Sequence, residues 1–218
     1  MRRALGPVVA LMLLLPAAPA AADVHLMKIT EVFAGVASEP DAHYVELQMY
    51  SSGQNVTNGA SVEVFDAANI SVATFTFAAN VANSANQSRI LVATAEAETF
   101  FEVAADLEMS SASIPASGGK ACFEAPGHGV IDCVAWGDYT GPAGGVGTPF
   151  RAAEGIPAGA AMERSTKGNA TLEASDDTND SATDFRFGLP APRNNAGAIG
   201  AAPGGALTFA GNDSVPEL

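Results

Sequence analysis

Apolar and polar residues alternate over short stretches in the first half of the chain. Five segments have the pattern or length of strands: residues 25–33, 44–50, 62–65, 72–77 and 89–93. Successive side chains of a strand point to opposite faces of the sheet, so a period of two predicts strands with one buried face. Segments rich in Gly, Asn and Ser separate them and have turn composition. Many short strands at this spacing predict an all-β domain, either a sandwich or a barrel.

One segment departs from the alternation and predicts a helix. Residues 94–107 are rich in alanine and glutamate, and their aromatic residues recur at helical spacing. Thr94 is suited to the N-cap, and the glutamates that follow it favour the positive end of the helix dipole. We expect one short helix across an edge or an end of the β domain, with its aromatic residues packed in the core.

The two cysteines of the chain fall in a predicted hairpin. Residues 120–124 and 130–136 have strand composition, and the proline of the intervening turn disfavours a two-residue connection. A four-residue loop, 126–129, places Cys122 directly opposite Cys133, at a spacing that a disulfide accepts. A metal site would need more thiols or histidines nearby, and a redox pair is usually C-x-x-C. A structural disulfide is therefore the favoured interpretation.

The first residues have the three-part layout of a secretory signal. Arg2 and Arg3 precede the apolar run 8–15, and residues 20–22 are three alanines, which predicts cleavage before Asp23. A membrane anchor would need about 18 apolar residues. The run is shorter, and we expect no membrane span in the mature protein. The sequence thus predicts a secreted, periplasmic or cell-surface location.

The second half of the chain is less regular. Residues 161–165 predict one more strand, and residues 175–184 are polar and acidic. From Leu189 onward Pro, Gly, Ala and Asn dominate, a composition that does not build a core. We divide the chain into a signal peptide (1–22), one β domain (23–195) and a disordered tail (196–218).

The charge balance narrows the choice of partners. The formal net charge is −14 and becomes −16 when the two arginines of the signal peptide leave. An acidic surface repels phosphate backbones, and the sequence has no basic patch with interleaved aromatics, so we expect no nucleic-acid partner. The excess of carboxylates keeps a protein soluble and can also collect divalent cations.

Four short motifs occur in a fixed order along the chain. They are ITEVF (29–33), YVEL (44–47), VIDCVAWG (130–137), and MER (162–164) followed by DF (184–185) and LPAPRN (189–194). In this order they resemble the lamin tail domain, known from nuclear lamins and from many exported bacterial proteins. The chain departs from the family at the turn after the second strand, where NGAS (58–61) replaces a tryptophan-containing turn. The resemblance implies an immunoglobulin-like β-sandwich, and members of the family serve as binding or architectural modules.

Few residues are arranged for chemistry. His25, His43 and His128 have no partner at metal-ligand spacing, and we interpret them as exposed polar residues. Glu31 and Glu46 become neighbours if the first two strands pair, but two carboxylates perform acid–base work only when their environments separate their pKa values. We therefore expect no enzymatic activity and a structural role for this pair.

The acidic run before the tail is the best candidate for a metal site. Its oxygen-bearing residues are Asp176, Asp177, Asn179, Asp180 and Asp184. Hard oxygen ligands on a loop suit calcium, although the run lacks the glycine and the distal glutamate of an EF-hand loop. No other cofactor is expected.

Six N-x-[ST] triplets, at Asn55, Asn69, Asn86, Asn169, Asn179 and Asn212, would be glycosylation acceptors in a eukaryotic secretory pathway. The Ala- and Gly-rich, Lys-poor composition is more typical of a bacterial protein. The sequence predicts a non-catalytic module that presents its loops to a protein, a glycan or the cell envelope. The alternatives are a calcium-stabilised structural component of the envelope, and a small secreted hydrolase that uses Glu31 and Glu46.

Overall fold

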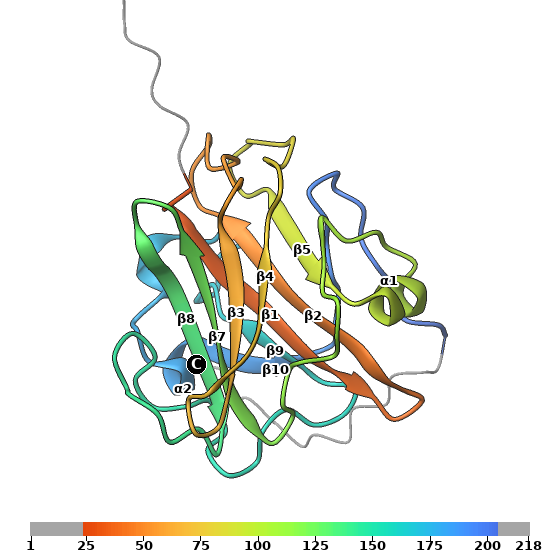
Figure 1. Ribbon diagram of the computed structural model, residues 1–218, viewed down its shortest axis with the longest axis vertical. Helices are drawn as coiled ribbons and strands as arrows, with labels where there is room; N and C mark the ends of the chain where they lie inside the picture. The colour runs from red at the N-terminus through yellow and green to blue at the C-terminus, as the bar shows by residue number, and fades with distance from the viewer. Residues whose placement is uncertain (1–23, 205–218) are drawn as a thin grey trace, which may run out of the picture.

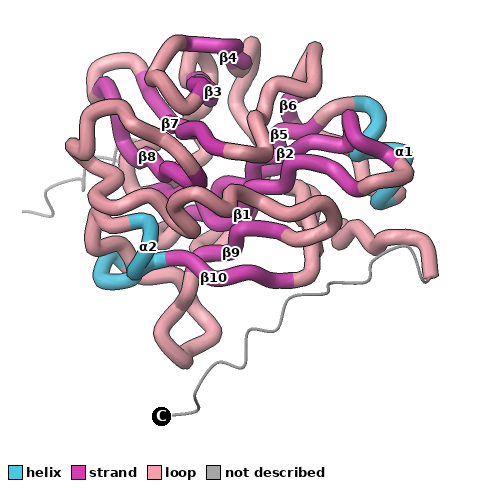
Figure 2. Tube along the Cα trace, turned by 90° about the horizontal axis from the view of Figure 1, so that it is seen from below, coloured by secondary structure: helices cyan, strands magenta, loops and turns pink. Residues whose placement is uncertain are grey.

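The alternating segments form the strands of two β-sheets stacked face to face. In a computed structural model, which describes residues 24–204, all but one pair of neighbouring strands run antiparallel (Figure 1). The six-stranded sheet has the order β10 (Phe185–Gly188), β9 (Ala161–Arg164), β1 (Met27–Val36), β2 (Glu39–Met49), β5 (Arg89–Ala93) and β6 (Leu107–Glu108). The four-stranded sheet has the order β4 (Ser71–Thr76), β3 (Ser61–Asp66), β7 (Gly118–Ala125) and β8 (Gly129–Gly137). Figure 2 shows the two layers from below. The prediction of a mostly β fold is confirmed, in a sandwich-like arrangement rather than a barrel.

The core lies between the two sheets and uses the inward face of each alternating segment. Val45, Leu47 and Met49, which share one face of β2, are all fully buried. From the facing sheet, Phe123 and Trp136 are fully buried against them in one continuous cluster. The period of two thus selects the buried face correctly.

A second apolar cluster covers part of the outer face of the six-stranded sheet. The helix α1 (Ala95–Phe101) packs Phe101 edge-on against Phe33 and Tyr44, with ring centroids 5.4 and 5.5 Å apart. The strand β2 is consequently buried on both faces from Ala42 to Met49. The expectation that the helical aromatics pack in a core is confirmed.

The helix is shorter than the predicted segment 94–107. Thr94 is the N-cap as expected, because its side chain accepts a hydrogen bond from the N–H of Ala97 at 3.2 Å. Glu102 then adopts a left-handed conformation with φ 54°, which ends the helix. Beyond it the chain turns back and forms the parallel strand β6 beside β5. Local helix propensity is overridden by pairing with a neighbouring strand.

The predicted hairpin and its disulfide are present. Cys122 and Cys133 are direct cross-strand partners of β7 and β8, with Cα atoms 4.1 Å apart, and they form a disulfide. The loop differs from the expected one, because Ala125 pairs with Gly129 and leaves a three-residue turn. A bulge at Ile131 restores the register, since Phe123 still faces Asp132. A short turn plus one bulged residue is equivalent in register to the four-residue loop.

The segment after β10 runs along the outer face of the six-stranded sheet, beside α1 (Figure 1). The N–H of Ala201 donates to the carbonyl of Phe101 at 3.0 Å, and Ala202 packs against the outer cluster. Residues 196–204 are therefore bonded to the domain, although the sequence predicts a disordered tail from residue 196. Residues 205–218, with Asn212, and residues 1–23, which include the predicted signal peptide 1–22, lie outside the described residues. Within 24–204, no helix has the length and apolar character needed to cross a membrane.

Candidate functional site

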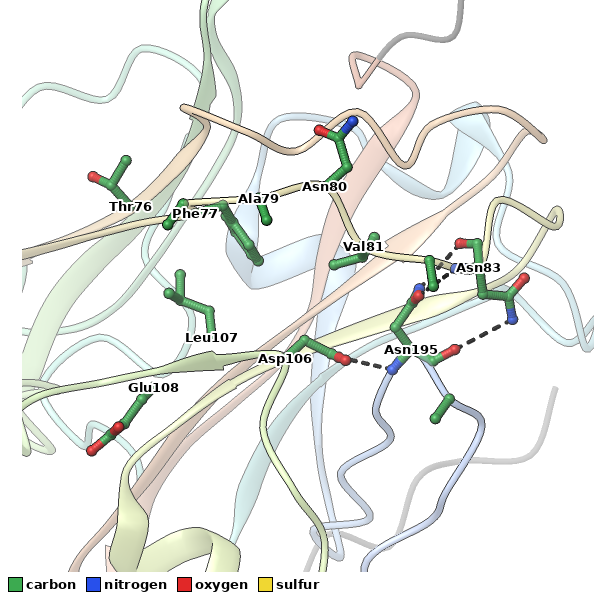
Figure 3. A pocket seen from close by; sticks show the side chains of 13 residues that line it. Thr76, Phe77, Ala79, Asn80, Val81, Asn83, Asp106, Leu107, Glu108 and Asn195 are labelled. Carbon is green, nitrogen blue, oxygen red and sulfur yellow. Dashed lines mark hydrogen bonds between the residues drawn. The ribbon is translucent and has the colours of Figure 1, made fainter.

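An open groove lies between the loop that follows β4 and the edge strand β6 (Figure 3). Its volume is about 750 Å³, and it is lined by residues 76–83, 106–108 and 195–196. Phe77, Val81 and Leu107 supply apolar surface, and Asn80 and Asn83 supply amide groups on the rim. A concave, largely apolar surface with a few polar groups is the usual character of a binding site.

The floor of the groove is fixed by Asn195. Its side-chain oxygen accepts the N–H of Asn83 at 2.6 Å, and its amide nitrogen donates to the carbonyls of Asn83 and Arg89 at 3.2 and 3.0 Å. Its own N–H donates to Asp106 Oδ2 at 2.8 Å, a contact drawn in Figure 3, and the same oxygen accepts the N–H of Leu91. Burial raises the pKa of Asp106, and these two N–H donors partly oppose the rise. These hydrogen bonds join the C-terminal segment to the loop that follows β4 and to the residue that precedes β6.

The opposite wall of the groove is also held in place. Thr57 Oγ1 donates to the carbonyl of Ala79 and accepts the N–H of Val81, both at 3.1 Å. The side chain of Asn55 donates to the carbonyl of Val81 at 3.0 Å. Because both walls are hydrogen-bonded to the sandwich, the groove is preformed.

The predicted pair Glu31 and Glu46 is brought together inside the protein. The two residues are direct partners of β1 and β2, and their exposed fractions are 5% and 0%. Glu31 accepts hydrogen bonds from the Tyr44 hydroxyl and from the N–H of Ala191. Burial, together with the neighbouring charge of Glu46, raises the pKa of Glu31 to about 8.

Glu46 has stronger partners than Glu31. It is ion-paired with Arg89, accepts the Thr30 hydroxyl at 3.0 Å, and accepts the N–H of Arg193 at 2.7 Å. Burial raises its pKa and the charge of Arg89 opposes this. The ion pair with Arg89 favours the ionised form of Glu46, whereas a pKa of about 8 leaves Glu31 protonated at neutral pH. The environments do separate the two carboxyl groups, but the C-terminal segment covers them.

The acidic run is organised by local hydrogen bonds. Asp176 accepts the N–H of Glu173 at 2.8 Å in a capping box of the short 3₁₀ helix η1 (Ala174–Asp176). Asp180 is the N-cap of α2 (Ser181–Asp184) and accepts the N–H of Thr183 at 3.1 Å. Asn179 lies between them with φ 56°, and its N–H donates to Asp177 Oδ1 at 3.0 Å.

The other two acidic residues of the run face buried cations. Asp177 is bonded to Lys28 and lies 3.3 Å from Arg164 Nη1, and Asp184 Oδ2 lies 3.7 Å from the same nitrogen. Burial opposes ionisation of Asp177, but the hydrogen bond from Lys28 and the charge of Arg164 lower its pKa overall. Among residues 24–204, no group of three or more His, Cys, Asp or Glu side chains has the geometry of a metal site. Calcium binding by this run stays a prediction, which melting in calcium and in chelator tests.

The histidines differ from one another in their surroundings. His43 lies within β2 and is buried, not exposed as expected, because its ring joins two segments: Nδ1 accepts the N–H of Ile114 at 3.1 Å and Nε2 lies 3.0 Å from the carbonyl of Pro40. Burial lowers its pKa. His25 and His128 are exposed as expected, but their rings are stacked with centroids 5.0 Å apart.

Comparison with protein-family models, with curated proteins and with solved structures finds no match. The site is therefore argued from its own geometry.

Sequence reasoning missed the groove. Asp106 falls in the predicted helix, and Asn195 falls at the border of the predicted tail. Their meeting depends on contacts between distant segments, which no local pattern contains. The one usable signal was the polar pair Asn194-Asn195 in a segment otherwise rich in Ala, Gly and Pro, since buried amides form several hydrogen bonds.

Proposed function

We propose that this chain is an exported, non-catalytic binding module of the lamin-tail type, with an immunoglobulin-like sandwich that holds a partner in the groove beside β6. The four ordered motifs support the family, and they fall on β1, β2, β8 and the β9–β10 region. The disulfide suits an oxidising compartment outside the cytosol.

The groove carries the proposal. It is open to solvent and preformed, and it combines apolar floor residues with amide groups on its rim. Such a surface binds a segment of a protein or a glycan through apolar contacts and a few directed hydrogen bonds. The ionisable clusters, in contrast, are buried and occupied by partners from the same chain, which supports a structural role for them.

A matched pair of substitutions tests the role of the groove. Ala79 lines the groove and is exposed, so Ala79→Trp fills the groove without disturbing the core. Ala170 is also exposed but lies outside the groove, so Ala170→Trp is the control. We expect the wild-type protein to bind members of a peptide array or a glycan array, Ala170→Trp to bind equally, and Ala79→Trp to lose binding.

Three outcomes would contradict the proposal. The first is a wild-type protein that binds nothing on either array. The second is an Ala79→Trp variant that binds as well as the wild type. The third is hydrolysis of esterase, phosphatase, nuclease or glycosidase substrates that disappears in Glu31→Gln, because that result would show an enzyme.

A further inference from the structure

The edges of both sheets border the groove. The strand β4 is the last strand of the four-stranded sheet, and β6 is the last strand of the six-stranded sheet. Thr76 of β4 lines one side of the groove, and Leu107 and Glu108 of β6 line the other (Figure 3). An edge strand presents backbone N–H and C=O groups that have no partner strand, and such a row is a template for pairing with another chain.

The register of β4 shows which of its backbone groups face the free edge. The N–H of Phe77 donates to the carbonyl of Ala60, on the side of β3, at 2.9 Å. Opposed residues of an antiparallel pair alternate between hydrogen-bonded and non-hydrogen-bonded pairs, so Thr76 and Thr74 stand in non-bonded pairs with β3. The N–H and C=O groups of both threonines therefore point away from β3. Within residues 24–204, no strand pairs with β4 on that side.

The opposite edge of the same sheet is closed at the end of β8. The N–H of Gly137 donates to the carbonyl of Phe150 at 2.8 Å, and the N–H of Phe150 donates to the carbonyl of Ala135 at 2.9 Å. The N–H of Ala135 donates to Ser181 Oγ at 3.0 Å. The segment Ala73–Thr76 of β4 has no such cover, and it contains no proline and no charged residue, which commonly protect an edge strand from pairing.

A strand added to the free edge of β4 would place side chains in the groove. Phe75 and Phe77 are 5% and 3% exposed and face the core, and the residues next to Phe75 are more exposed. A strand paired with β4 follows the same alternation, so every second side chain points to the core side of the sheet. The apolar side chains of Val81 and Leu107 line the groove and are available to receive those side chains.

We propose that the groove binds an extended, cationic segment of another protein, which adds to the free edge of β4 as a new strand of the smaller sheet. This deepens the proposed binding function and rests on it. Hydrogen bonds to the backbone of Thr74 and Thr76 hold the segment, and its alternate apolar side chains enter the groove. Only a polypeptide presents N–H and C=O groups at the spacing of a strand, so the free edge favours a protein segment over a glycan.

The charge of the groove sets the charge of the segment. The residues that line the groove include two carboxyl groups, Asp106 and Glu108, and no Lys, Arg or His. Asp106 already accepts two backbone N–H groups, whereas Glu108 is exposed and can face a Lys or Arg of the ligand. The formal net charge of −14 disfavours a second copy of this chain as the occupant, because like charges across an interface oppose association.

The probes for the test are short synthetic peptides in which valine alternates with threonine and a lysine stands at one end. Replacing single backbone N–H groups of the peptide by N-methyl removes one donor at a time and changes no residue of the protein. Alternate residues of an added strand bond to β4, so we expect binding to be lost at every second position and retained at the positions between. Isothermal titration calorimetry measures these affinities.

Hydrogen exchange on the unmodified protein gives a second readout. The N–H groups of Thr74 and Thr76 should exchange rapidly in the free protein and several-fold more slowly with the peptide bound. The N–H of Phe75, which is directed at β3, should change little.

Two substitutions test the same contacts from the side of the protein. Thr74→Pro removes one N–H at the free edge, where proline is tolerated, and should lose most of the binding, with its thermal midpoint showing that it is folded. Glu108→Gln should weaken binding of the lysine-bearing peptide several-fold. Its control is Glu154→Gln, which changes an exposed glutamate outside the groove and should bind as the wild type does.

Several results would overturn strand addition and leave the proposed function intact. One is a peptide that Ala79→Trp no longer binds but whose N-methyl scan has no period of two. Another is a folded Thr74→Pro variant that binds as well as the wild type. A third is a wild-type protein that binds members of the glycan or peptide arrays but none of these probes. Peptides ending in glutamate that bind as tightly as those ending in lysine would overturn the cationic preference. A protein that binds nothing on the arrays would instead contradict the proposed function itself.

Discussion

At the scale of single residues, one buried ion pair joins the two sheets. Asp132 points inward from β8, accepts Arg164 Nη2 at 2.9 Å and accepts the N–H of Ile29 in β1 at 2.7 Å. Arg164 completes the link because its Nε donates to the carbonyl of Ile29 at 2.8 Å. The side chains of Asp132 and Arg164 are 2% and 1% exposed, so neither can be solvated once its partner is removed. Burial raises the pKa of Asp132, and the charges of Arg164 and Lys28 oppose that rise.

Removing the carboxylate of Asp132 should lower the stability of the fold. We expect Asp132→Ala to lower the free energy of unfolding by about 1–3 kcal/mol for each buried donor that loses its acceptor, Arg164 Nη2 and the N–H of Ile29. Asp177 and Asp184 still lie beside Arg164 Nη1, so the charge of Arg164 keeps two carboxylate neighbours. Urea denaturation followed by circular dichroism measures the loss. The control is Glu154→Ala, which breaks an exposed pair with Arg151 and should cost less than about 1 kcal/mol. A loss of similar size in both variants would show that the buried link contributes little.

The protonated Glu31 makes stability depend on pH. Its pKa is about 8 in the folded chain and 4.5 in the unfolded chain, so folding takes up a proton between these values. Stability should therefore fall as pH rises from about 4.5 to about 8, by at most about 1.4 kcal/mol per pH unit from this group. Glu31→Gln mimics the neutral carboxyl and should flatten the decline, whereas the exposed Glu154→Gln should follow the wild-type curve. Urea midpoints across this range decide the matter, and a Glu31→Gln curve parallel to the wild type would refute the assignment.

The sequence predicts that Glu31 and Glu46 can be neighbours, but it does not predict which of them is protonated. The prediction depended on the pairing of the first two strands, and the register of β1 and β2 makes Glu31 and Glu46 direct partners. The sequence pattern does not reveal that residues 191 and 193, far along the chain, donate their N–H groups to the pair. The prediction that His43 is exposed was wrong for the same reason, because its burial depends on Ile114 and on the segment that contains Ile114.

At the scale of elements, the disulfide ties β7 to β8 across a loop with a sequence separation of 11. Closing a loop of this length removes unfolded-state entropy equivalent to about 2–3 kcal/mol. We expect reductant to lower the thermal midpoint of the wild type accordingly. The double variant Cys122→Ser, Cys133→Ser should melt at the lower temperature and be insensitive to reductant. A reductant-dependent shift in that variant would mean that the effect is not due to this bond.

The C-terminal segment is an element of the fold through Asn195. Asn195→Ala removes three side-chain hydrogen bonds and leaves the N–H of Asn83 and the carbonyl of Arg89 without their partner. An unsatisfied group costs about 1–3 kcal/mol where it is buried and less where water reaches it, as at the exposed Asn83, so we expect a measurable loss of stability and a loosened groove. Hydrogen exchange should rise at Asn83 and Leu91 before it rises in β2. Exchange that rises evenly over the domain would argue against a local role.

Elements were predictable where their residues alternate and missed where they depend on distant partners. The strands β1, β2, β3, β4 and β5 each overlap a predicted segment, although β2 begins at Glu39, before the predicted residue 44, and β1 has two register shifts against β2. The two-residue β6 lies within the predicted helix, and β10 has only four residues, half of them phenylalanine. Such short strands form because a neighbouring strand offers its free edge, β5 to β6 and β9 to β10, and a local pattern does not report that edge.

At the scale of the whole molecule, the number of layers follows from the central strands of the larger sheet, which are buried on both faces. The strands β1 and β2 lie in the middle of the larger sheet and carry apolar residues on both faces, so they need a second covering layer outside the sandwich. The helix α1 and the segment 189–204 supply it. This explains why a segment with the composition of a disordered tail belongs to the domain: its small side chains cover the outer apolar cluster, and its N–H groups bond to Glu31 and Glu46.

The negative net charge should lower the stability of the folded state. Folding gathers the formal net charge of −14 into a small volume, and the repulsion among exposed carboxylates opposes the compact state. Salt screens exposed charges beyond about 10 Å at 0.1 M but affects buried pairs such as Asp132 and Arg164 far less. We therefore expect the thermal midpoint to rise when sodium chloride is added from about 0.01 M to about 0.15 M. Potassium chloride should act equally, because screening does not depend on the identity of the ion. A double variant Glu102→Lys, Glu154→Lys reduces the net charge by four and should respond less. A midpoint that falls with salt would show that exposed ion pairs outweigh the general repulsion.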